Sequence, residues 1–365
     1  MTASKSGRRP RKRWVLAGAT AVGVVAVVLA VAANASKGSG KAPVPTPPAT
    51  QLSDSQPKLV FTYFYYWYDL PNGTHSTALT NRPAAPDASY KSVPWLKQQL
   101  SDMEYAGIDV ALAVYWGDEE PSSDVGLRNM AQAASALRAE GSTPPTIGMF
   151  LDTGQIGRWP EGQRDLTKEA NQARVYALIK RFYSEVPRDQ WAEVEGRPVV
   201  WLWGSWLGIR FDQAFFDYVY ARFTADFGVR PYVVADNSWR YATKDKLFGG
   251  TEQDMSRPIA VDDFYSWGAS LTGYREEGGN IAEIGPGYDE RQLKGSDRTG
   301  RFTDRQDGLF YQQSWRAAIA SGKRFVAIET WDEFHEASEI ADSVEYGRRY
   351  LDLTRQFAAQ FKGGQ

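Results

Sequence analysis

The feature that most constrains the fold is a regular alternation of two hydrophobic patterns between Lys58 and Phe361. Short runs rich in β-branched and aromatic residues are typical of buried strands, and amphipathic stretches with helical spacing separate most of them. Eight such units over about 300 residues predict an α/β fold consisting of a single (β/α)8 or TIM barrel. The expected strands span residues 59–67, 109–116, 145–152, 197–206, 230–239, 257–267, 280–288 and 324–331, and the expected helices span residues 93–108, 125–141, 166–186, 212–228, 306–323 and 343–361.

A doubly wound open sheet is the alternative architecture. Such a sheet commonly carries a glycine-rich phosphate-binding turn directly after its first strand. Here the first run leads instead into YYWYD at residues 65–69, which contains no glycine. The sequence therefore favours the barrel.

The first 57 residues are expected to lie outside the barrel. Residues 1–35 combine five Lys or Arg between positions 8 and 13 with a 20-residue apolar stretch from Trp14 to Ala33. This length is close to the ~20 residues that span a bilayer, and the basic residues predict an anchor with its amino terminus inside the cell. Ala33-Asn34-Ala35 fits the cleavage pattern of a secretory signal peptide, but the apolar core of such signals is usually shorter, about 7–15 residues, which favours the anchor. Either alternative predicts an extracytoplasmic protein, with residues 36–57 as a Pro/Ser/Gly-rich linker and residues 58–363 as one catalytic domain.

The composition excludes several classes of function. Lys and Arg number 42 against 44 Asp and Glu, so no basic footprint for nucleic acid is present. The absence of cysteine removes disulfides, thiolate nucleophiles and Cys-ligated zinc, and only two histidines, His75 and His335, exclude a His-rich zinc site. We expect no cofactor and no catalytic metal, although carboxylates at the strand ends could bind Ca²⁺.

Aromatic and acidic residues gather where the expected strands end. In a barrel of this type the site lies at the carboxyl ends of the strands, and acceptors between stacking rings predict a carbohydrate-binding cleft. The alternative is that these rings simply cap the core. The candidate substrate-binding residues are Tyr66, Trp67, Tyr68, Trp116, Asp152, Trp203, Asp263, Tyr265, Tyr288 and His335.

The segment WDEFHE, residues 331–336, crowds three carboxylates after the last expected strand. Glu333 and Glu336 are three residues apart, so a chain that coils there would place their Cβ atoms ~5–6 Å apart on one face. Retaining glycosidases need two carboxyl groups about 5–5.5 Å apart, and repulsion makes one of them keep its proton. We predict that Glu333 and Glu336 are catalytic and that His335, Asp332 and Glu339 orient or polarise them. The alternative is an acidic helix start, which the helix dipole favours.

Six segments, in order along the chain, resemble the motifs of one enzyme family. They are FTYFYYWYD (61–69), EGRPVVWLWGSW (195–206), VDDFYSW (261–267), IGPGYDER (284–291), RQDGLFYQQSWRAAI (305–319) and ETWDEFHEASEI (329–340). The last resembles the signature W-N-E-W-H-E-G-T-Q-I-E of family 99 glycoside hydrolases, the endo-α-mannosidase and endo-α-mannanase group. Related domains of unknown function and WbsX-type glycan proteins show the same likeness.

This resemblance implies a retaining, endo-acting hydrolase of O-glycosyl bonds that needs no metal or cofactor. Glu336 matches the general acid/base of the family. Glu333 matches the residue that acts on the 2-hydroxyl of the sugar, which attacks the anomeric carbon through a 1,2-anhydro sugar. Tyr288 matches the tyrosine that lines the reacting subsite.

The sequence departs from the family where the sugar is selected. Asp332 and Phe334 replace Asn and Trp, and the third strand ends FLDT (150–153) where the family has H-I-E-P-Y. We therefore expect an exported glycosidase with a monomeric catalytic domain and a polysaccharide or glycan substrate, without carrying over mannose specificity. The alternative is a membrane-tethered protein of surface-polysaccharide assembly that binds or remodels glycan without net hydrolysis.

Overall fold

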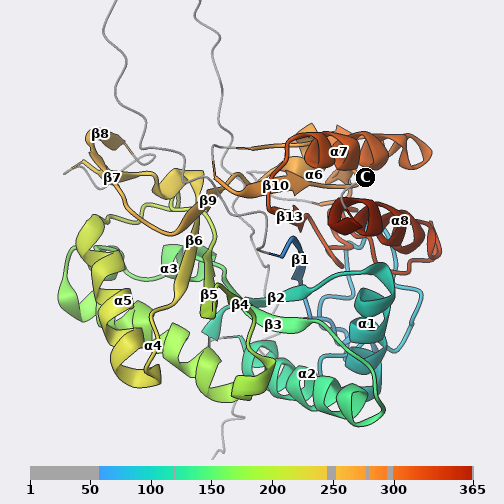
Figure 1. Cartoon of the computed structure of the whole chain (residues 1–365), viewed down its shortest axis with the longest axis horizontal. Helices are drawn as coiled ribbons and strands as arrows, with labels where there is room; N and C mark the ends of the chain where they lie inside the picture. The colour runs from blue at the N-terminus through green and yellow to red at the C-terminus, as the bar shows by residue number, and fades with distance from the viewer. Residues whose placement is uncertain (1–56, 118–119, 245–251, 277–278, 294–298, 364–365) are drawn as a thin grey trace, which may run out of the picture.

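The computed structural model describes residues 57–363 except 118–119, 245–251, 277–278 and 294–298 (Figure 1). The expected anchor or signal segment and nearly all of the expected linker lie outside the described residues. Within the described ranges, no helix is both long enough and apolar enough to cross a membrane.

Eight parallel strands form a nearly closed barrel (Figure 1). Hydrogen-bonded neighbours follow the order β10-β13-β1-β2-β3-β5-β6-β9, so only the β9–β10 seam lacks a ladder. The parallel barrel predicted from the alternating runs is thus confirmed, with each strand shorter than its run. The barrel strands are β1 (Leu59–Phe64), β2 (Val110–Tyr115), β3 (Thr146–Leu151), β5 (Arg197–Leu202), β6 (Tyr232–Asp236), β9 (Asp263–Tyr265), β10 (Ile281–Ile284) and β13 (Phe325–Ile328).

The longer helices alternate with the barrel strands and pack on the outside of the barrel, whereas the four-residue helices at 154–157 and 269–272 follow strand ends at its mouth (Figure 1). In α1, the Ser92 side chain accepts a hydrogen bond from the Trp95 amide, and Gly107 ends the helix at φ 79°. This conformation suits glycine because it lies in the left-handed region. The helices are α1 (Val93–Ala106), α2 (Pro121–Ala139), α3 (Gly154–Gly157), α4 (Glu169–Glu185), α5 (Gln213–Phe227), α6 (Ala269–Thr272), α7 (Leu309–Ala320) and α8 (Arg349–Gly363).

Short antiparallel pairs, which the sequence did not predict, extend from the barrel. Strand β7 (Tyr241–Thr243) pairs with β8 (Gln253–Pro258), and β11 (Tyr288–Asp289) pairs with β12 (Phe302–Thr303). The first residues of the expected strand 257–267 therefore belong to β8, and only residues 263–265 join the barrel. A further short strand, β4 (Glu193–Val194), pairs with the start of β5.

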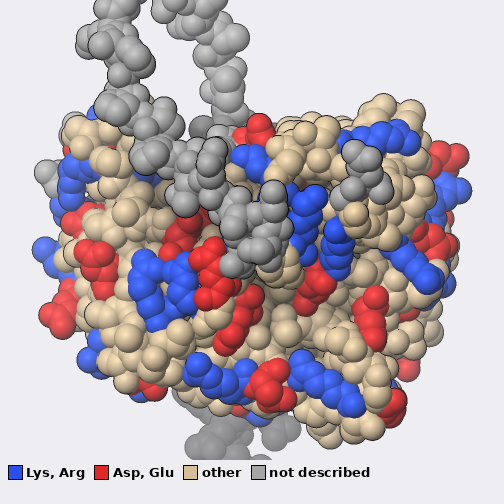
Figure 2. All heavy atoms as spheres, in the orientation of Figure 1, with Lys and Arg blue, Asp and Glu red and all other residues tan. Residues whose placement is uncertain are grey.

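Large aromatic side chains fill the interior of the barrel. Trp201 lies 5.3 Å from Phe61 and 5.2 Å from Tyr265 between ring centroids, and Tyr63 lies 4.7 Å from Phe150. Their rings form a packed layer inside the barrel, below its mouth. Figure 2 shows acidic and basic side chains interspersed over the described part of one face, in keeping with the near-zero net charge.

Asp263 closes the β9–β10 seam. It is buried at the start of β9, and its carboxylate accepts hydrogen bonds from the amides of Asn280 (3.1 Å to each oxygen) and Phe264 (2.9 Å). The sequence predicted Asp263 at the carboxyl end of its strand. This prediction was wrong, because β9 begins at Asp263 and ends at Tyr265.

Candidate active site

The segment after β13 crosses the mouth of the barrel as a turn at residues 334–337 rather than as the start of a helix. Asp332 anchors its beginning, because its buried Oδ1 accepts a hydrogen bond from the Tyr65 amide (2.7 Å). The Glu333 amide donates to the Thr330 hydroxyl (2.9 Å). Glu333 and Glu336 are thus presented by a turn, and the helical face that the sequence suggested does not form.

Glu333 is held by its own turn. It is buried, and its Oε1 accepts a hydrogen bond from the His335 amide (3.1 Å) and lies 2.9 Å from His335 Nδ1. The imidazole stacks on Tyr68, with ring centroids 5.7 Å apart. The Tyr68 hydroxyl donates to the Asp332 carbonyl (2.8 Å) and accepts from the Phe334 amide (3.1 Å). Among the described residues, none donates to Oε2 of Glu333, which leaves that oxygen for a ligand.

Glu336 lies beside the β11–β12 hairpin and is partly exposed. Its carbonyl accepts a hydrogen bond from the Asp289 amide (2.7 Å). The pKa of Arg301 is raised chiefly by its hydrogen bonds to Glu290, with a smaller contribution from the negative charge of Glu336. Tyr288 donates to Glu290 Oε2 (3.0 Å). The structure therefore places Tyr288 on the same hairpin that flanks Glu336.

Tyr65 lies within reach of the charges of several acidic groups and was missed by the sequence prediction. Burial raises its pKa well above the usual value, and the nearby charges of Glu333, Asp152 and Glu336 raise it further. No hydrogen bond of its hydroxyl is present within the described chain. Because side chains alternate along a strand, the inward positions Phe61 and Tyr63 continue to Tyr65. That alternation could have identified it.

A stack of three rings forms one wall of the mouth. Trp67 lies between His75 (4.3 Å between centroids, 7° between planes) and Trp116 (4.9 Å, 12°). Trp116 Nε1 donates to Asp152 Oδ2 (2.6 Å), and the Gly154 amide donates to Asp152 Oδ1 (2.7 Å). Burial raises the pKa of Asp152. Both faces of Trp67 are covered, so Trp67 contributes an edge rather than an open face.

A second aromatic group follows strands β5 and β9. Trp203 lies 5.2 Å from Trp206 and 6.2 Å from Trp267 between ring centroids, in both cases edge to face. A Cβ built on Gly154 would lie 2.8 Å from Asp152 Oδ1 and 3.6 Å from Trp203. Glycine at position 154 thus lets the two aromatic groups approach each other. Trp267 was absent from the predicted residues.

Two further residues predicted to bind substrate do not lie beside Glu333 and Glu336. Tyr66 is fully buried, and its hydroxyl donates to the Ser123 carbonyl of α2 (3.0 Å). Tyr265 is buried inside the barrel and donates to the Leu202 carbonyl (3.2 Å). Like Asp263, both make contacts that support the barrel wall rather than its mouth.

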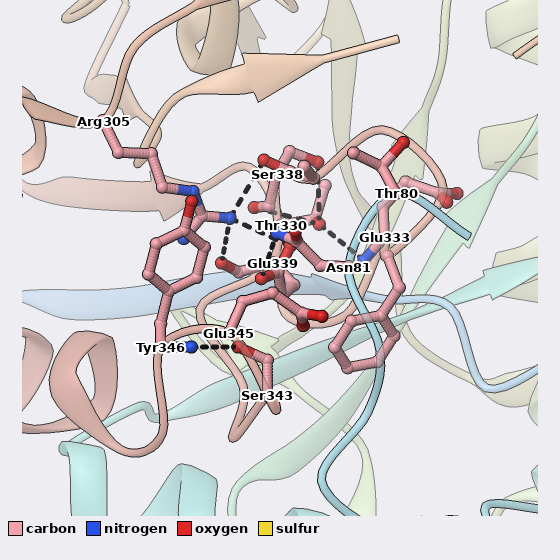
Figure 3. A network of polar contacts seen from close by, with 12 residues as sticks. Thr80, Asn81, Arg305, Thr330, Glu333, Ser338, Glu339, Ser343, Glu345 and Tyr346 are labelled. Atoms are coloured by element: carbon pink, nitrogen blue, oxygen red, sulfur yellow. Dashed lines mark hydrogen bonds and ion pairs between the residues drawn. The ribbon is translucent and has the colours of Figure 1, made fainter. Parts of the chain in front are cut away.

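A buried ion pair secures the far end of the turn that carries Glu333 and Glu336 (Figure 3). Arg305 Nη2 lies 2.9 Å from Glu339 Oε2 and also donates to the carbonyls of Ala337 and Glu339 (2.9 Å each). Asn81 Nδ2 donates to Glu339 Oε1 (2.8 Å), and the Thr80 hydroxyl donates to the His335 carbonyl (2.7 Å). These contacts are consistent with the predicted orienting role of Glu339, whereas the contribution of Arg305 was not predicted.

In the part of the chain that the structure describes, no group of three His, Asp or Glu side chains is arranged to hold a metal ion.

Comparison with solved structures shows which proteins share this fold. A family GH99 endo-α-mannosidase from Bacteroides thetaiotaomicron, in complex with Bis-Tris-propane, is 17% identical with a TM-score of 0.60, over 83% of this chain and 97% of that one. A second structure of that enzyme is 15% identical with a TM-score of 0.59, over 84% and 98% of the two chains. A glycoside hydrolase-like protein is 11% identical with a TM-score of 0.55, over 87% and 96%.

One family model matches the barrel from its first strand to its last helix. No curated protein matches the sequence. The model described as Domain of unknown function (DUF5010) matches residues 60–363. The chain therefore belongs to the DUF5010 family, and its barrel has the fold of the GH99 endo-α-mannosidases.

Proposed function

We propose that the protein is an exported retaining glycoside hydrolase that cleaves within a polysaccharide or glycan, with Glu333 and Glu336 as its catalytic pair. The observation that carries the proposal is that one turn after β13 presents both glutamates, and that the charges of Glu333, Asp152 and Glu336 all lie near enough to Tyr65 to raise its pKa. Aromatic rings flank this group of acids, as in sites that bind sugar rings. The fold shared with GH99 enzymes supports the same reading.

The contacts of the two glutamates suit different roles. Glu333 is oriented by His335 and keeps Oε2 for the substrate, so it acts as the base that removes the proton of the sugar 2-hydroxyl. The 2-oxygen then forms a bond to the anomeric carbon while the glycosidic bond breaks, and Glu336 gives its proton to the departing oxygen. Water next attacks the anomeric carbon of the 1,2-anhydro sugar. Glu336 takes a proton from that water, and Glu333 returns its proton to the 2-oxygen.

The substrate is proposed only as a class. The solved relatives are named endo-α-mannosidases, so α-mannans belong in a test panel. The Asp152–Gly154 turn after β3 departs from the family motif, and Asp152 is already bonded to Trp116. We therefore include other envelope and plant glycans with the mannans. Export follows from the sequence of residues 1–35.

The test compares the purified full-length chain with Glu336→Gln and Glu333→Gln on this panel, with oligosaccharide release followed by mass spectrometry. Loss of a general acid or base is expected to lower kcat by about 10²–10⁴-fold. Glu140→Gln is the matched control, because Glu140 is exposed and pairs with Lys97 on the surface. Unchanged release by Glu336→Gln would remove that residue from the mechanism. Binding of a glycan without cleavage by the unaltered chain would favour the tethered binding protein instead.

A further inference from the structure

Two buried carboxylates that the proposed chemistry does not use hold one segment of the mouth. Glu329, directly after β13, accepts hydrogen bonds from the amides of Gly268 (2.7 Å, to Oε1) and Ser270 (3.2 Å, to Oε2). The Ser270 hydroxyl donates to the Glu329 carbonyl. Asp236, at the end of β6, accepts from the Trp267 amide (3.2 Å). The segment 267–270 is thus fixed through its backbone by side chains from two other strands.

The side chain that this segment carries is Trp267. Its indole is partly exposed, meets Tyr63 edge to face (4.9 Å between centroids) and stacks on Phe150 (5.8 Å, 19°). In the strand order, β9 is separated from β2 by three intervening strands in each direction around the barrel. The backbone of Trp267 thus starts on the side of the barrel opposite β2, and its indole reaches the interior rings of Tyr63 on β1 and Phe150 on β3, the two strands that flank β2.

We propose that Glu329 is a positioning residue that holds Trp267, packed on Tyr63 and Phe150, as an aromatic surface that faces the sugar and is separate from the Trp67–Trp116 stack. The statement that Trp267 faces a sugar rests on the proposed function. The statement that Glu329 fixes residues 267–270 does not. Hydrogen bonds from amides to a carboxylate are among the stronger ones in proteins, and several of them converge here. Gly268 adopts φ 113°, which favours glycine, and a Cβ at this position would lie 3.1 Å from Arg275.

The surroundings of Glu329 make its hold sensitive to pH. Burial raises its pKa to about 7, and the hydrogen-bonding amides and Arg275 oppose that rise. The carboxyl groups of Glu283 on β10 and Asp236 on β6 face the same region, and burial raises the pKa of both. The tyrosines facing it are Tyr63, Tyr65 and Tyr265. When Glu329 is protonated, one of its oxygens becomes a hydrogen-bond donor and the carboxyl group loses its charge. The amides of Gly268 and Ser270 then have a weaker acceptor, so the segment 267–270 is held less firmly.

The first experiment is hydrogen exchange of the full chain, followed by mass spectrometry of peptides that cover residues 263–274. In Glu329→Gln, the amides of Gly268 and Ser270 are expected to exchange roughly 10-fold faster or more, because a bond to a charged acceptor is lost. Lowering the pH from 8 to 6 should, after correction for intrinsic rates, have the same effect in the unaltered chain but not in the variant. Unchanged exchange in Glu329→Gln overturns the proposal.

The matched control is Glu283→Gln. Glu283 is equally buried and lies close to Glu329, but it bonds the Tyr63 hydroxyl (2.6 Å) and not the segment 267–270. Its exchange at residues 268 and 270 should match that of the unaltered chain at pH 8. Faster exchange in both variants would mean that loss of any buried acid loosens the barrel, which also overturns the specific role of Glu329.

The second experiment measures kinetics on the glycan that the unaltered chain cleaves. Glu329→Gln and Trp267→Ala should raise KM roughly 10-fold while kcat changes by less than about 3-fold, and Trp267→Phe should retain most of the affinity because a ring remains. An unchanged KM in both variants overturns the substrate role. If no glycan is cleaved, the proposed function fails, and the exchange measurement still decides whether Glu329 positions the segment.

Discussion

The turn that carries Glu333 and Glu336 depends on the buried pair of Arg305 and Glu339. Both side chains are almost completely buried, and together they bond the carbonyls of the turn and the Asn81 side chain. Burial raises the pKa of Glu339, and the charge of Arg305 opposes that rise. The spacing of the carboxylates predicted a catalytic pair, but it could not reveal Arg305 as the partner of Glu339, because Arg305 lies 34 residues earlier in the chain.

We predict that Glu339→Gln lowers the free energy of unfolding by about 3–5 kcal/mol, because it leaves the Arg305 guanidinium buried without a counter-charge. Urea denaturation of the full chain measures this loss. The double variant Arg305→Met, Glu339→Met should recover part of it, since apolar replacement of both partners removes the uncompensated charge. A cost below about 1 kcal/mol for the single variant would contradict a structural role for the pair.

Among the elements, the short strand β9 is the weakest member of the barrel wall. It pairs with β6 over three residues and forms no ladder with β10. Asp263 replaces the missing ladder by accepting from the Asn280 amide. The alternating pattern predicted a strand over 257–267. That pattern could not separate residues 263–265, which join the barrel, from the exposed residues at the end of β8. The composition of an apolar run does not reveal which strand the run pairs with.

Asp263→Ala is expected to destabilise the protein by about 2 kcal/mol or more, because the amides of Asn280 and Phe264 lose their acceptor in a buried place. Asp263→Asn retains one acceptor oxygen and should cost clearly less. Thermal unfolding compares the variants, and hydrogen exchange at Asn280 locates the change. Equal unfolding temperatures for Asp263→Ala and the unaltered chain would show that the seam does not need this carboxylate.

For the whole molecule, the sequence was sufficient to predict the barrel but only part of its mouth. Eight hydrophobic runs separated by helical spacing identify the architecture, because each strand of a closed parallel barrel is buried on both faces. The position of a side chain at the mouth depends on where its strand stops. An error of one residue turns that side chain to the other face, as the neighbours Tyr65 and Tyr66 show. The turn at residues 334–337 depends on partners that are distant in sequence, such as Tyr68 and Thr80.

The pH dependence of stability is a further prediction for the whole molecule. Glu329 has a pKa of about 7 in the folded chain against an ordinary value of 4.5, so the folded state favours its protonated form. Its contribution to stability is fully present below pH 4.5 and is lost as the pH rises through 7, by about 3.5 kcal/mol at ~1.4 kcal/mol per pKa unit. Burial, with the charge of His335, lowers the pKa of His75 to about 3, which acts in the opposite direction as the pH falls below 6.5.

Urea unfolding at pH 5 and pH 8 separates these contributions when the unaltered chain is compared with Glu329→Gln. The loss of stability between the two pH values should be about 2.5 kcal/mol larger in the unaltered chain, because only that chain can ionise residue 329. Parallel pH profiles for the two proteins would exclude Glu329 as the titrating group.

The close, nearly parallel contact of Trp67 and Trp116 has an optical consequence. Indole transitions at such a separation couple, so the pair should produce a split band of opposite signs in the ultraviolet circular dichroism spectrum. A saccharide that enters between the walls and displaces either ring would collapse that band. The chain thus contains an intrinsic, label-free reporter for occupancy of its mouth.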